Sequence, residues 1–273
     1  MRILSIETSF DETATAVTDG RKVLSNIVYS QVLLHKNWGG VVPTIAKRAH
    51  EERIDFVIND ALVKATRHSR LDRESVYPSK LEERSGADPR IREDDKVLVE
   101  DDNLTGGKRG RTPNSAQITA SVSSTGRRET LDRTRQIMKN IDYIAVTYGP
   151  GLAIALEVGI NKAIELAKKY DKKIIPVNHM EGHIYSSFLQ NSVGNPKRTF
   201  EFPYIGLLVS GAHTELVLWE DYLKFKILGE TVDDAAGEAL DKASKMLGLG
   251  YPGGALIERL ALKVKNKDFY NFP

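Results

Sequence analysis

One stretch of the chain, from Arg67 to Arg135, differs from the sequence on both sides of it. It contains 12 of the chain's 18 arginines, and 28 of its 69 residues are charged. Its apolar residues follow neither a helical nor a strand period, so it buries too little apolar surface to offset the entropy of ordering. We therefore predict a disordered insertion at 67–135. A basic arm for RNA is a weaker alternative, because 13 acidic residues nearly balance 15 basic ones, and a segment foreign to the protein's ancestry is a third.

On either side of this segment, apolar residues alternate between strand and helix periods. The expected strands cover 3–6, 13–17, 23–29, 141–146, 173–177, 204–209 and 215–219. The expected helices cover 43–64, 152–169 and 179–188, the last of them capped by Asn178. Opening strands followed by alternating strands and helices predict an α/β protein.

The composition excludes several classes of protein. The chain has no cysteine, which removes disulfide scaffolds, thiolate metal sites and thiol nucleophiles. The acid at Glu7 prevents an apolar signal region, and no run of about 18 apolar residues is present to span a bilayer. We expect a cytoplasmic protein that does not enter a membrane. Because the net charge is only +2, a nucleic-acid substrate would have to be recognised at a specific site.

Two kinds of loop are candidates for binding an anion or orienting a reacting group. The opening turn carries hydroxyl groups and the carboxylates of Asp11 and Glu12, which can hold a cation or orient a nucleophile. Glycines at 149, 151 and 211 let the backbone approach a ligand closely. A polar hairpin and ordinary turns explain the same residues, so these loops do not establish a site by themselves.

His179 and His183 stand four residues apart on a predicted helix, so both imidazoles share one face and can bind one divalent metal ion. The intervening sequence is not the HExxH motif of zinc proteases, because Glu181 does not directly follow the first histidine. Two histidines are also one ligand short of the three that catalytic metals usually have. Helix-surface histidines without a metal remain the alternative.

Three carboxylates recur later at helical spacing. Asp234, Glu238 and Asp241 are separated by four and three residues, which predicts that they share one helix face. Carboxylates in this pattern can bind ribose hydroxyls or a metal-held water. A solvated face with an ion pair between Glu238 and Lys242 is the simpler interpretation. The glycine-rich loop at 248–254 has room for a flat ring against the backbone.

Six ordered segments resemble the bacterial tRNA N6-adenosine threonylcarbamoyltransferase family, whose members were formerly called O-sialoglycoprotein endopeptidases. They are IETSFDETATAV (6–17), SQVLLHKNWGGVVPTIAKRAH (30–50), IDYIAVTYGPGLAIALEVG (141–159), PVNHMEGHIYSSFL (176–189), LLVSGAHTEL (207–216) and LGETVDDAAGEALDKASKMLGLGYPGG (228–254). The resemblance covers nearly everything outside the predicted insertion.

The resemblance implies a two-lobed α/β fold of the actin, Hsp70 and sugar-kinase type, with the ligand between the lobes. The first lobe would comprise 1–66 and 136–190, and 200–273 would be the start of an incomplete second lobe. The implied reaction transfers a threonylcarbamoyl group from threonylcarbamoyl-AMP to N6 of adenosine 37 in tRNAs that read codons starting with A. The implied partners are a paralogous subunit and an ATPase subunit, with the helix at 43–64 as a docking surface.

Matching motif positions assign roles to individual residues. His179 and His183 would bind one divalent metal ion, Fe²⁺ in the first place and Zn²⁺ as the alternative. Asp11 or Glu12 would orient the attacking amine or take its proton. The adenylate would contact Leu208, Val209, Ser210, Gly211, Ala212, Asp241 and Gly254, and the last two would hold its nucleoside.

The sequence also departs from the family pattern. Phe10 stands where the family usually has a cysteine, and Ala212 stands where a second glycine is usual. The family continues beyond Pro273, where it supplies an asparagine for the nucleotide and an aspartate for the metal. A non-catalytic scaffold that binds a partner is therefore an alternative function, and a metalloprotease is a less favoured one.

Overall fold

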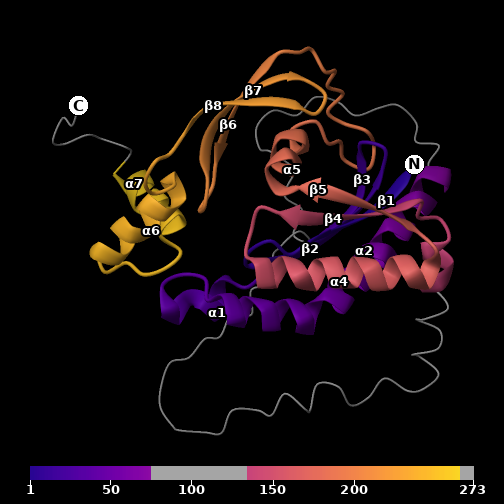
Figure 1. The fold of residues 1–273 in the computed structure, drawn as a ribbon, viewed down its shortest axis with the longest axis horizontal. Helices are drawn as coiled ribbons and strands as arrows, with labels where there is room; N and C mark the ends of the chain where they lie inside the picture. The colour runs from indigo at the N-terminus through magenta and orange to yellow at the C-terminus, as the bar shows by residue number, and fades with distance from the viewer. Residues whose placement is uncertain (75–133, 265–273) are drawn as a thin grey trace, which may run out of the picture.

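Two β-sheets form the centre of the structure (Figure 1). The computed structural model describes residues 1–74 and 134–264. The strands of the first sheet are β1 (Arg2–Glu7), β2 (Glu12–Asp19), β3 (Lys22–Ser30), β4 (Tyr143–Gly149) and β5 (Lys173–Asn178). Their order is β3-β2-β1-β4-β5. The first three strands pair antiparallel, whereas β4 and β5 run parallel to β1.

The burial of each strand follows from its place in this sheet. Leu4 and Ile6 on β1 and Val17 on β2 belong to one core, because alternate side chains of a strand face the same side. The inner strand β4 is buried over residues 144–147 without alternation, as expected for a strand covered on both faces. The pairing of β1 with β4 joins the two parts of the chain that the charged segment separates.

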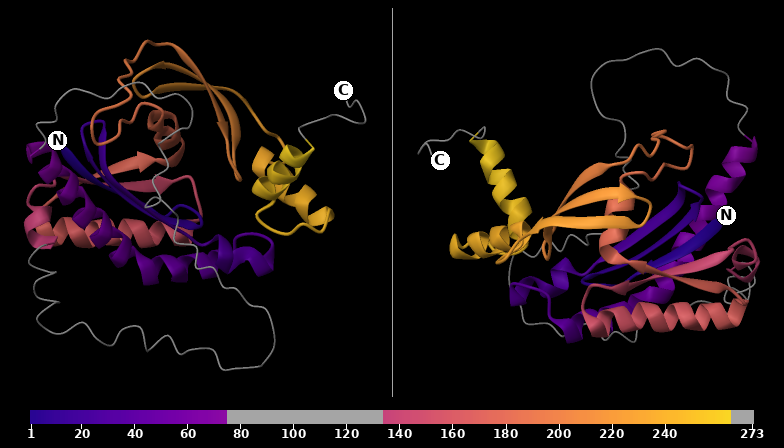
Figure 2. Two further views of the ribbon diagram at one scale, coloured as in Figure 1. Left: turned by 180° about the vertical axis from the view of Figure 1, so that it is seen from behind. Right: turned by 45° about the horizontal axis from the view of Figure 1, so that its top comes forward.

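Helices cover both faces of the first sheet (Figures 1 and 2). α2 (Pro43–Glu74) and α4 (Ala153–Tyr170) pack together on one face, and α5 (His179–Ser186) lies on the other. This arrangement confirms the α/β class. α2 ends at Glu74 rather than at the predicted 64, so it includes the start of the predicted insertion, while residues 75–133 lie outside the described part. Among the described helices, none has the length and apolar character that crossing a bilayer requires.

The second sheet is antiparallel and packs against α5 and the residues after it through aromatic rings. Its strands are β6 (Tyr204–Val209), β7 (Thr214–Asp221) and β8 (Lys224–Glu230), followed by helices α6 (Ala236–Met246) and α7 (Gly253–Lys263). β8 is not among the strands predicted from the sequence, although Phe225 and Ile227 alternate with lysines; its residues are mostly exposed. Trp219 contacts the rings of Tyr185 and Phe188 at centroid distances of 4.7 and 5.4 Å, which joins this sheet to α5 and the residues after it. The predicted lobe boundaries stay a prediction.

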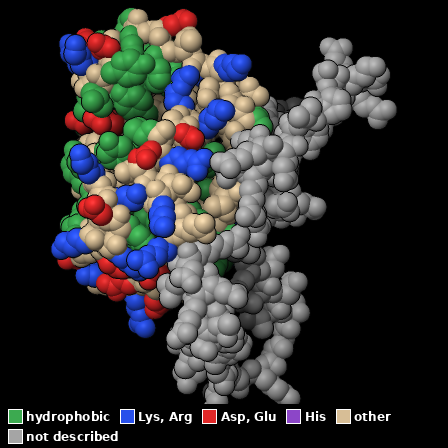
Figure 3. All heavy atoms as spheres, turned by 90° about the vertical axis from the view of Figure 1, so that its right-hand side faces the viewer, with side chains coloured by type: hydrophobic (Ala, Val, Ile, Leu, Met, Phe, Trp, Pro, Cys, Tyr) green, Lys and Arg blue, Asp and Glu red, His purple; other side chains and the backbone are tan. Residues whose placement is uncertain are grey.

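The outer face of the second sheet is apolar and exposed. Ile205 and Leu207 on β6 are 69% and 66% exposed, and Leu207 pairs with the exposed Leu216 on β7. Figure 3 shows a different side of the molecule, the one that lies to the right in Figure 1, where hydrophobic side chains are interspersed with charged ones. The inner face, by contrast, carries the aromatic cluster that packs against α5 and Phe188.

Candidate functional site

A cleft of about 520 Å³ opens between the first sheet and the loops of the second. It is lined by Glu7, Ser9, Phe10, Asp11, Glu12, Pro150, Gly151, Leu152, His179, His183, Ser210, Gly211, Ala212, His213 and Tyr251. The residues from the first sheet follow β1, β4 and β5, which run parallel and therefore end at one edge. In open α/β sheets, ligands bind at the carboxyl ends of the strands. This cleft is therefore the candidate site.

The opening turn and the glycine loop after β4 form one wall of the cleft. The backbone N–H of Leu152 donates to the carbonyl oxygen of Ser9 at 2.8 Å. Gly151 has a φ of +154°, and a Cβ at this position would lie 2.6 Å from the same carbonyl oxygen. Only glycine permits so close an approach. The two loops that the sequence presents as separate candidates thus belong to one site.

The histidine pair lies at the start of α5, as the sequence predicts. The Asn178 side chain caps the helix by accepting from the N–H groups of Met180 and Glu181 at 2.9 and 3.3 Å. His179 and His183 are therefore one helical turn apart, and their Nε2 atoms are 3.0 Å apart. The two rings are nearly perpendicular, with an interplanar angle of 88°.

Glu7 orients the first histidine of the pair. Its Oε2 atom lies 3.3 Å from Nδ1 of His179, and the hydroxyl of Ser9 lies 3.2 Å from the same nitrogen. Burial would raise the pKa of Glu7, but hydrogen bonds with His179, Ser9 and Thr147 outweigh it and lower the pKa to about 2. The ionised carboxylate accepts a hydrogen bond from the N–H at Nδ1. This leaves the lone pair on Nε2 of His179, directed at His183.

This arrangement fits part of a metal site. Two nitrogen ligands at about 2.1 Å from a tetrahedral metal are about 3.4 Å apart, close to the 3.0 Å between the two Nε2 atoms. Burial, with His179 and His213 nearby, lowers the pKa of His183 and favours the neutral imidazole that binds metals. Within residues 1–74 and 134–264, however, no three His, Asp or Glu side chains are grouped to hold a metal ion. The described residues therefore supply two of the usual three ligands.

Asp11 and Glu12 line the cleft opposite the loops of the second sheet. Burial raises the pKa of Asp11, and the charge of Asp241 acts in the same direction. Burial also raises the pKa of Glu12, and repulsion by Asp11 and Glu7 adds to it. Tyr251 faces the same carboxylates, and burial together with Asp11 and Asp241 raises its pKa to about 12. A carboxylate with a raised pKa is a stronger base than one in water.

The loop between β6 and β7 forms the opposite wall. Ser210, Gly211 and Ala212 all line the cleft, and the backbone N–H of Gly237 in α6 donates to the Ser210 carbonyl at 3.1 Å. The N–H groups of Ala212 and His213 donate to the Ser210 hydroxyl at 3.2 and 2.9 Å. An anionic oxygen bound here would therefore compete with that hydroxyl for the two amides.

The remaining predicted contact residues lie outside the lining of the cleft. Leu208 packs against the aromatic cluster, and the Val209 side chain is exposed. Asp241 accepts a hydrogen bond from the N–H of Gly253 at 2.6 Å, which anchors the loop before Gly254 to α6. The prediction that three carboxylates share one helix face is wrong for Asp234. This residue precedes α6, which begins at Ala236.

Several residues of the cleft are not among those proposed from the sequence. Glu7, His213 and Tyr251 line it; each stands inside one of the six family-like segments, but no spacing to a neighbouring polar residue marks it individually. For Glu7 a signal does exist, because it ends a strand that is parallel to the strand before His179. Polar residues at the ends of parallel strands meet at one edge.

Comparison with known proteins shows which family the chain belongs to. The family model described as "TsaD: tRNA N6-adenosine threonylcarbamoyltransferase" matches residues 22–73 and 127–273. The chain belongs to this family. Two relatives named tRNA N6-adenosine threonylcarbamoyltransferase, from Staphylococcus aureus strains JH9 and MSSA476, are 39% and 38% identical over 272 residues. Membership agrees with the fold type that the six segments imply.

The matches cover the chain more completely than they cover the relatives. In both Staphylococcus aureus proteins the aligned region is 99% of this chain but 57% of the relative, so the chain spans little more than half of their length. Among solved structures, YeaZ from Pseudomonas aeruginosa aligns with a TM-score of 0.35 and 11% identity, covering 85% of this chain and 68% of that chain.

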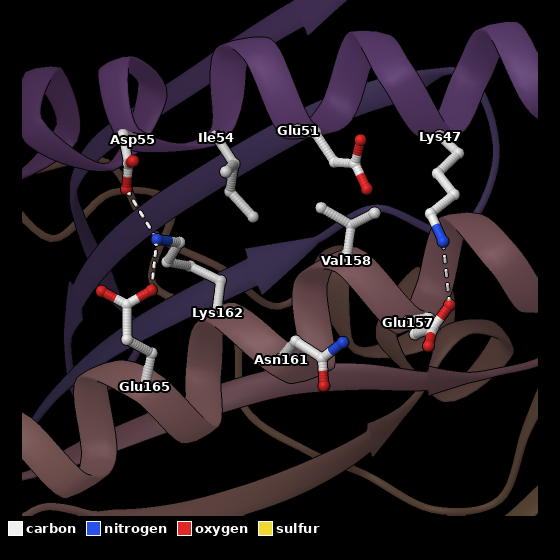
Figure 4. Close-up of a pocket in the computed structure, with 9 residues that line it drawn as sticks. All are labelled: Lys47, Glu51, Ile54, Asp55, Glu157, Val158, Asn161, Lys162 and Glu165. Carbon is white, nitrogen blue, oxygen red and sulfur yellow. Dashed lines mark hydrogen bonds and ion pairs between the residues drawn. The ribbon is translucent and has the colours of Figure 1, made fainter.

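A second hollow, of about 280 Å³, lies between α2 and α4 (Figure 4). Lys162 bridges Asp55 and Glu165 at 3.0 and 2.5 Å, and Lys47 pairs with Glu157 at 3.2 Å. Its lysines are thus held in ion pairs, whereas the cleft brings carboxylates, imidazoles and glycine-bearing loops together. Of the two, the cleft is therefore the better candidate site.

Replacing Glu7 by glutamine is expected to weaken metal binding about 10- to 100-fold, the usual effect of losing an outer-sphere carboxylate. The amide retains the size of the side chain but not the charge that selects the Nδ1–H form of His179. Titration calorimetry with Zn²⁺ measures the effect. Glu157→Gln, at an exposed ion pair on α4, is the control. Unchanged Zn²⁺ affinity in Glu7→Gln would contradict the orienting role.

Proposed function

We propose that the chain takes part in transfer of the threonylcarbamoyl group from threonylcarbamoyl-AMP to N6 of adenosine 37 in tRNAs that read A-starting codons. The observation that carries the proposal is the meeting of three groups in one cleft. The histidine pair, the acidic turn and the Ser210–Gly211–Ala212 loop come from distant parts of the chain and face the same space. Each supplies one function that acyl transfer from an adenylate requires.

The proposed reaction is a substitution at the carbamoyl carbon. The N6 amine of adenosine attacks that carbon, and a new C–N bond forms. The bond between the carbamoyl carbon and the phosphate oxygen breaks, and its electron pair leaves with AMP. The amine loses one proton, so the products are threonylcarbamoyladenosine, AMP and H⁺.

The acidic turn is placed to receive that proton. Asp11 and Glu12 are the carboxylates of the cleft with raised pKa, which makes either of them a stronger proton acceptor than a carboxylate in water. The leaving phosphate gains negative charge, and the backbone N–H groups of Ala212 and His213 can donate to it if the Ser210 hydroxyl rotates away. Asp241, which accepts from the Gly253 N–H, and Gly254, the residue after Gly253, are proposed to hold the nucleoside.

A divalent metal ion belongs to the same proposal. His179 and His183 would hold it through Nε2, and Fe²⁺ is preferred over Zn²⁺ only by family resemblance. When bound, such an ion would polarise the carbamoyl or phosphate oxygen. The third ligand is not supplied by the described residues.

The proposed partners are tRNA, a paralogous subunit and an ATPase subunit, all in the cytoplasm. A docking surface for the paralogous subunit is proposed on α2. This helix exposes Phe56, which is 59% accessible and directly follows Asp55, one of the residues that line the charged hollow in Figure 4. An exposed aromatic residue rimmed by charges is typical of interfaces between proteins.

Asp11→Asn tests the proposal directly. The full chain is incubated with its partner subunits, threonylcarbamoyl-AMP and tRNA, and threonylcarbamoyladenosine is measured by mass spectrometry. We expect the wild-type chain to form product and Asp11→Asn to lower the rate about 100-fold or more, as for loss of a general base. Asp19→Asn, at an exposed ion pair with the N-terminus, is the control. No product from the wild-type chain would favour the scaffold alternative, and cleavage of a glycoprotein would favour the protease.

A further inference from the structure

A group of polar side chains is completely buried behind the acidic turn. Thr13, Gln31, His35 and His50 all have 0% exposure. Buried polar groups are costly unless each finds a hydrogen-bond partner. None of the four lines the cleft, so the proposed chemistry does not use them directly.

His50 binds the backbone of the turn. Its Nε2 atom lies 3.0 Å from the carbonyl oxygen of Phe10, and its Nδ1 atom lies 2.8 Å from the hydroxyl of Thr13. A carbonyl oxygen only accepts, so Nε2 carries the proton and donates to it. Nδ1 of the neutral ring then accepts from Thr13. The Gln31 amide nitrogen, 3.2 Å from Nδ1, lies on the same accepting side.

A second buried histidine continues the network. The backbone N–H of Val42 donates to Nδ1 of His35 at 3.3 Å, so Nε2 of His35 carries the proton and donates to the Gln31 side-chain oxygen at 3.3 Å. The backbone N–H of Gln31 in turn donates to the carbonyl oxygen of Asp11 at 2.9 Å. His35 ends the short helix α1 (Val32–His35) that leads from β3 toward α2.

The network holds the turn at two consecutive carbonyls. Phe10 O is bound by His50 from α2, and Asp11 O is bound by Gln31 at the end of β3. Burial lowers the pKa of both His35 and His50, so both rings stay neutral and keep these donor directions. On the other side of the turn, Ser9 O is bound by Leu152. The backbone that carries Asp11 and Glu12 is thus attached on both sides.

We propose that His50 is a positioning residue for the acidic turn: its N–H to Phe10 O sets the direction in which Asp11 and Glu12 enter the cleft. This inference rests on the proposed transfer function. Loss of the donor leaves Phe10 O unpaired, and the turn relaxes away from its place. Displacing a reacting group by about 1 Å can lower a rate about 100-fold.

Two substitutions separate positioning from a purely structural role. His50→Gln places an amide nitrogen near the position of Nε2 and keeps the donor to Phe10 O, whereas His50→Asn places it near Nδ1 and loses that donor. Both variants keep a polar side chain of similar size in the same buried position. The first measurement is the rate of threonylcarbamoyl transfer by the full chain with its partner subunits. The second is amide hydrogen exchange in peptides covering residues 9–12 and α4.

We expect His50→Asn to lower kcat at least about tenfold with less than a threefold change in KM for threonylcarbamoyl-AMP, and His50→Gln to recover most of kcat. Exchange at residues 9–12 should rise in His50→Asn while α4 stays protected. Equal losses of kcat in both variants, with faster amide exchange throughout the first sheet, would show a structural role and overturn the inference. Slow exchange at residues 9–12 in His50→Asn would overturn it too. If the wild-type chain transfers nothing, the proposed function fails, and the exchange comparison still decides whether His50 fixes the turn.

Discussion

His183→Ala is expected to lower the affinity for Zn²⁺ or Fe²⁺ more than about 100-fold. This loss is larger than the one expected for Glu7→Gln, which removes only a partner of a metal ligand. The substitution removes one of two Nε2 ligands that lie 3.0 Å apart, and a single imidazole holds a divalent ion only weakly. Metal content is measured by mass spectrometry after dialysis, and affinity by titration calorimetry. The fold should persist, because the His183 ring is not part of the aromatic cluster.

Glu181→Gln is the matched control for this prediction. Glu181 lies between the two histidines on α5, and a protease mechanism would need such a carboxylate as its base. We expect Glu181→Gln to bind metal and to transfer the threonylcarbamoyl group like the wild-type chain. Undiminished metal content in His183→Ala would contradict the metal assignment, and a loss of threonylcarbamoyl transfer in Glu181→Gln would show that Glu181 itself takes part in the reaction.

Gly237→Ala is expected to disrupt the loop that faces the acidic turn. A Cβ at Gly237 would lie 2.7 Å from both the Cα of Gly211 and the carbonyl oxygen of Ser210. These atoms are backbone, so α6 and the loop must move apart, at a cost of about 1–3 kcal/mol in the free energy of unfolding. The movement also breaks the hydrogen bond that the Gly237 N–H donates to the carbonyl oxygen of Ser210. Affinity for AMP, measured by calorimetry, should fall at least about tenfold.

The control for Gly237→Ala is another glycine of the second sheet. A Cβ at Gly229 on β8 meets nothing within 4 Å, so Gly229→Ala should leave both the melting temperature and AMP affinity nearly unchanged. Unaltered AMP affinity in a folded Gly237→Ala chain would show that the Ser210–Gly211–Ala212 loop does not contact the nucleotide. That result would leave the steric argument intact and remove the loop from the proposed site.

Local patterns were enough to predict the elements that build the cleft. The start of α5 is an example. The Asn178 side chain accepts from the N–H groups of the residues two and three positions later, and the two histidines follow at a fixed helical spacing. The strand β8 is the opposite case, since its apolar residues are mostly exposed and its pairing with β7 makes it a strand. The helix α2 also continues to Glu74, ten residues beyond the end that the apolar pattern predicts at 64.

The start of α6 shows why helix boundaries depend on distant residues. By spacing alone, Asp234 joins Glu238 and Asp241 on one helix face. In the structure the N–H of Ala236 donates to the hydroxyl of Thr214 at 2.9 Å, and the helix begins there. Asp234 instead forms an ion pair with Lys242. The contact that decides the boundary joins residues on β7 and α6, which no local pattern relates.

The sequence by itself determined the α/β class, the histidine pair, the candidate loops and, through six ordered segments, the family. These depend on spacings of a few residues, or on motifs that are visible in order along the chain. Only the tertiary structure decided that Glu7 orients His179 and that His50 holds the acidic turn. Those contacts join residues 172 and 40 positions apart. They form because parallel strands end at one edge and α2 packs across β2, and neither arrangement has a local signature in the sequence.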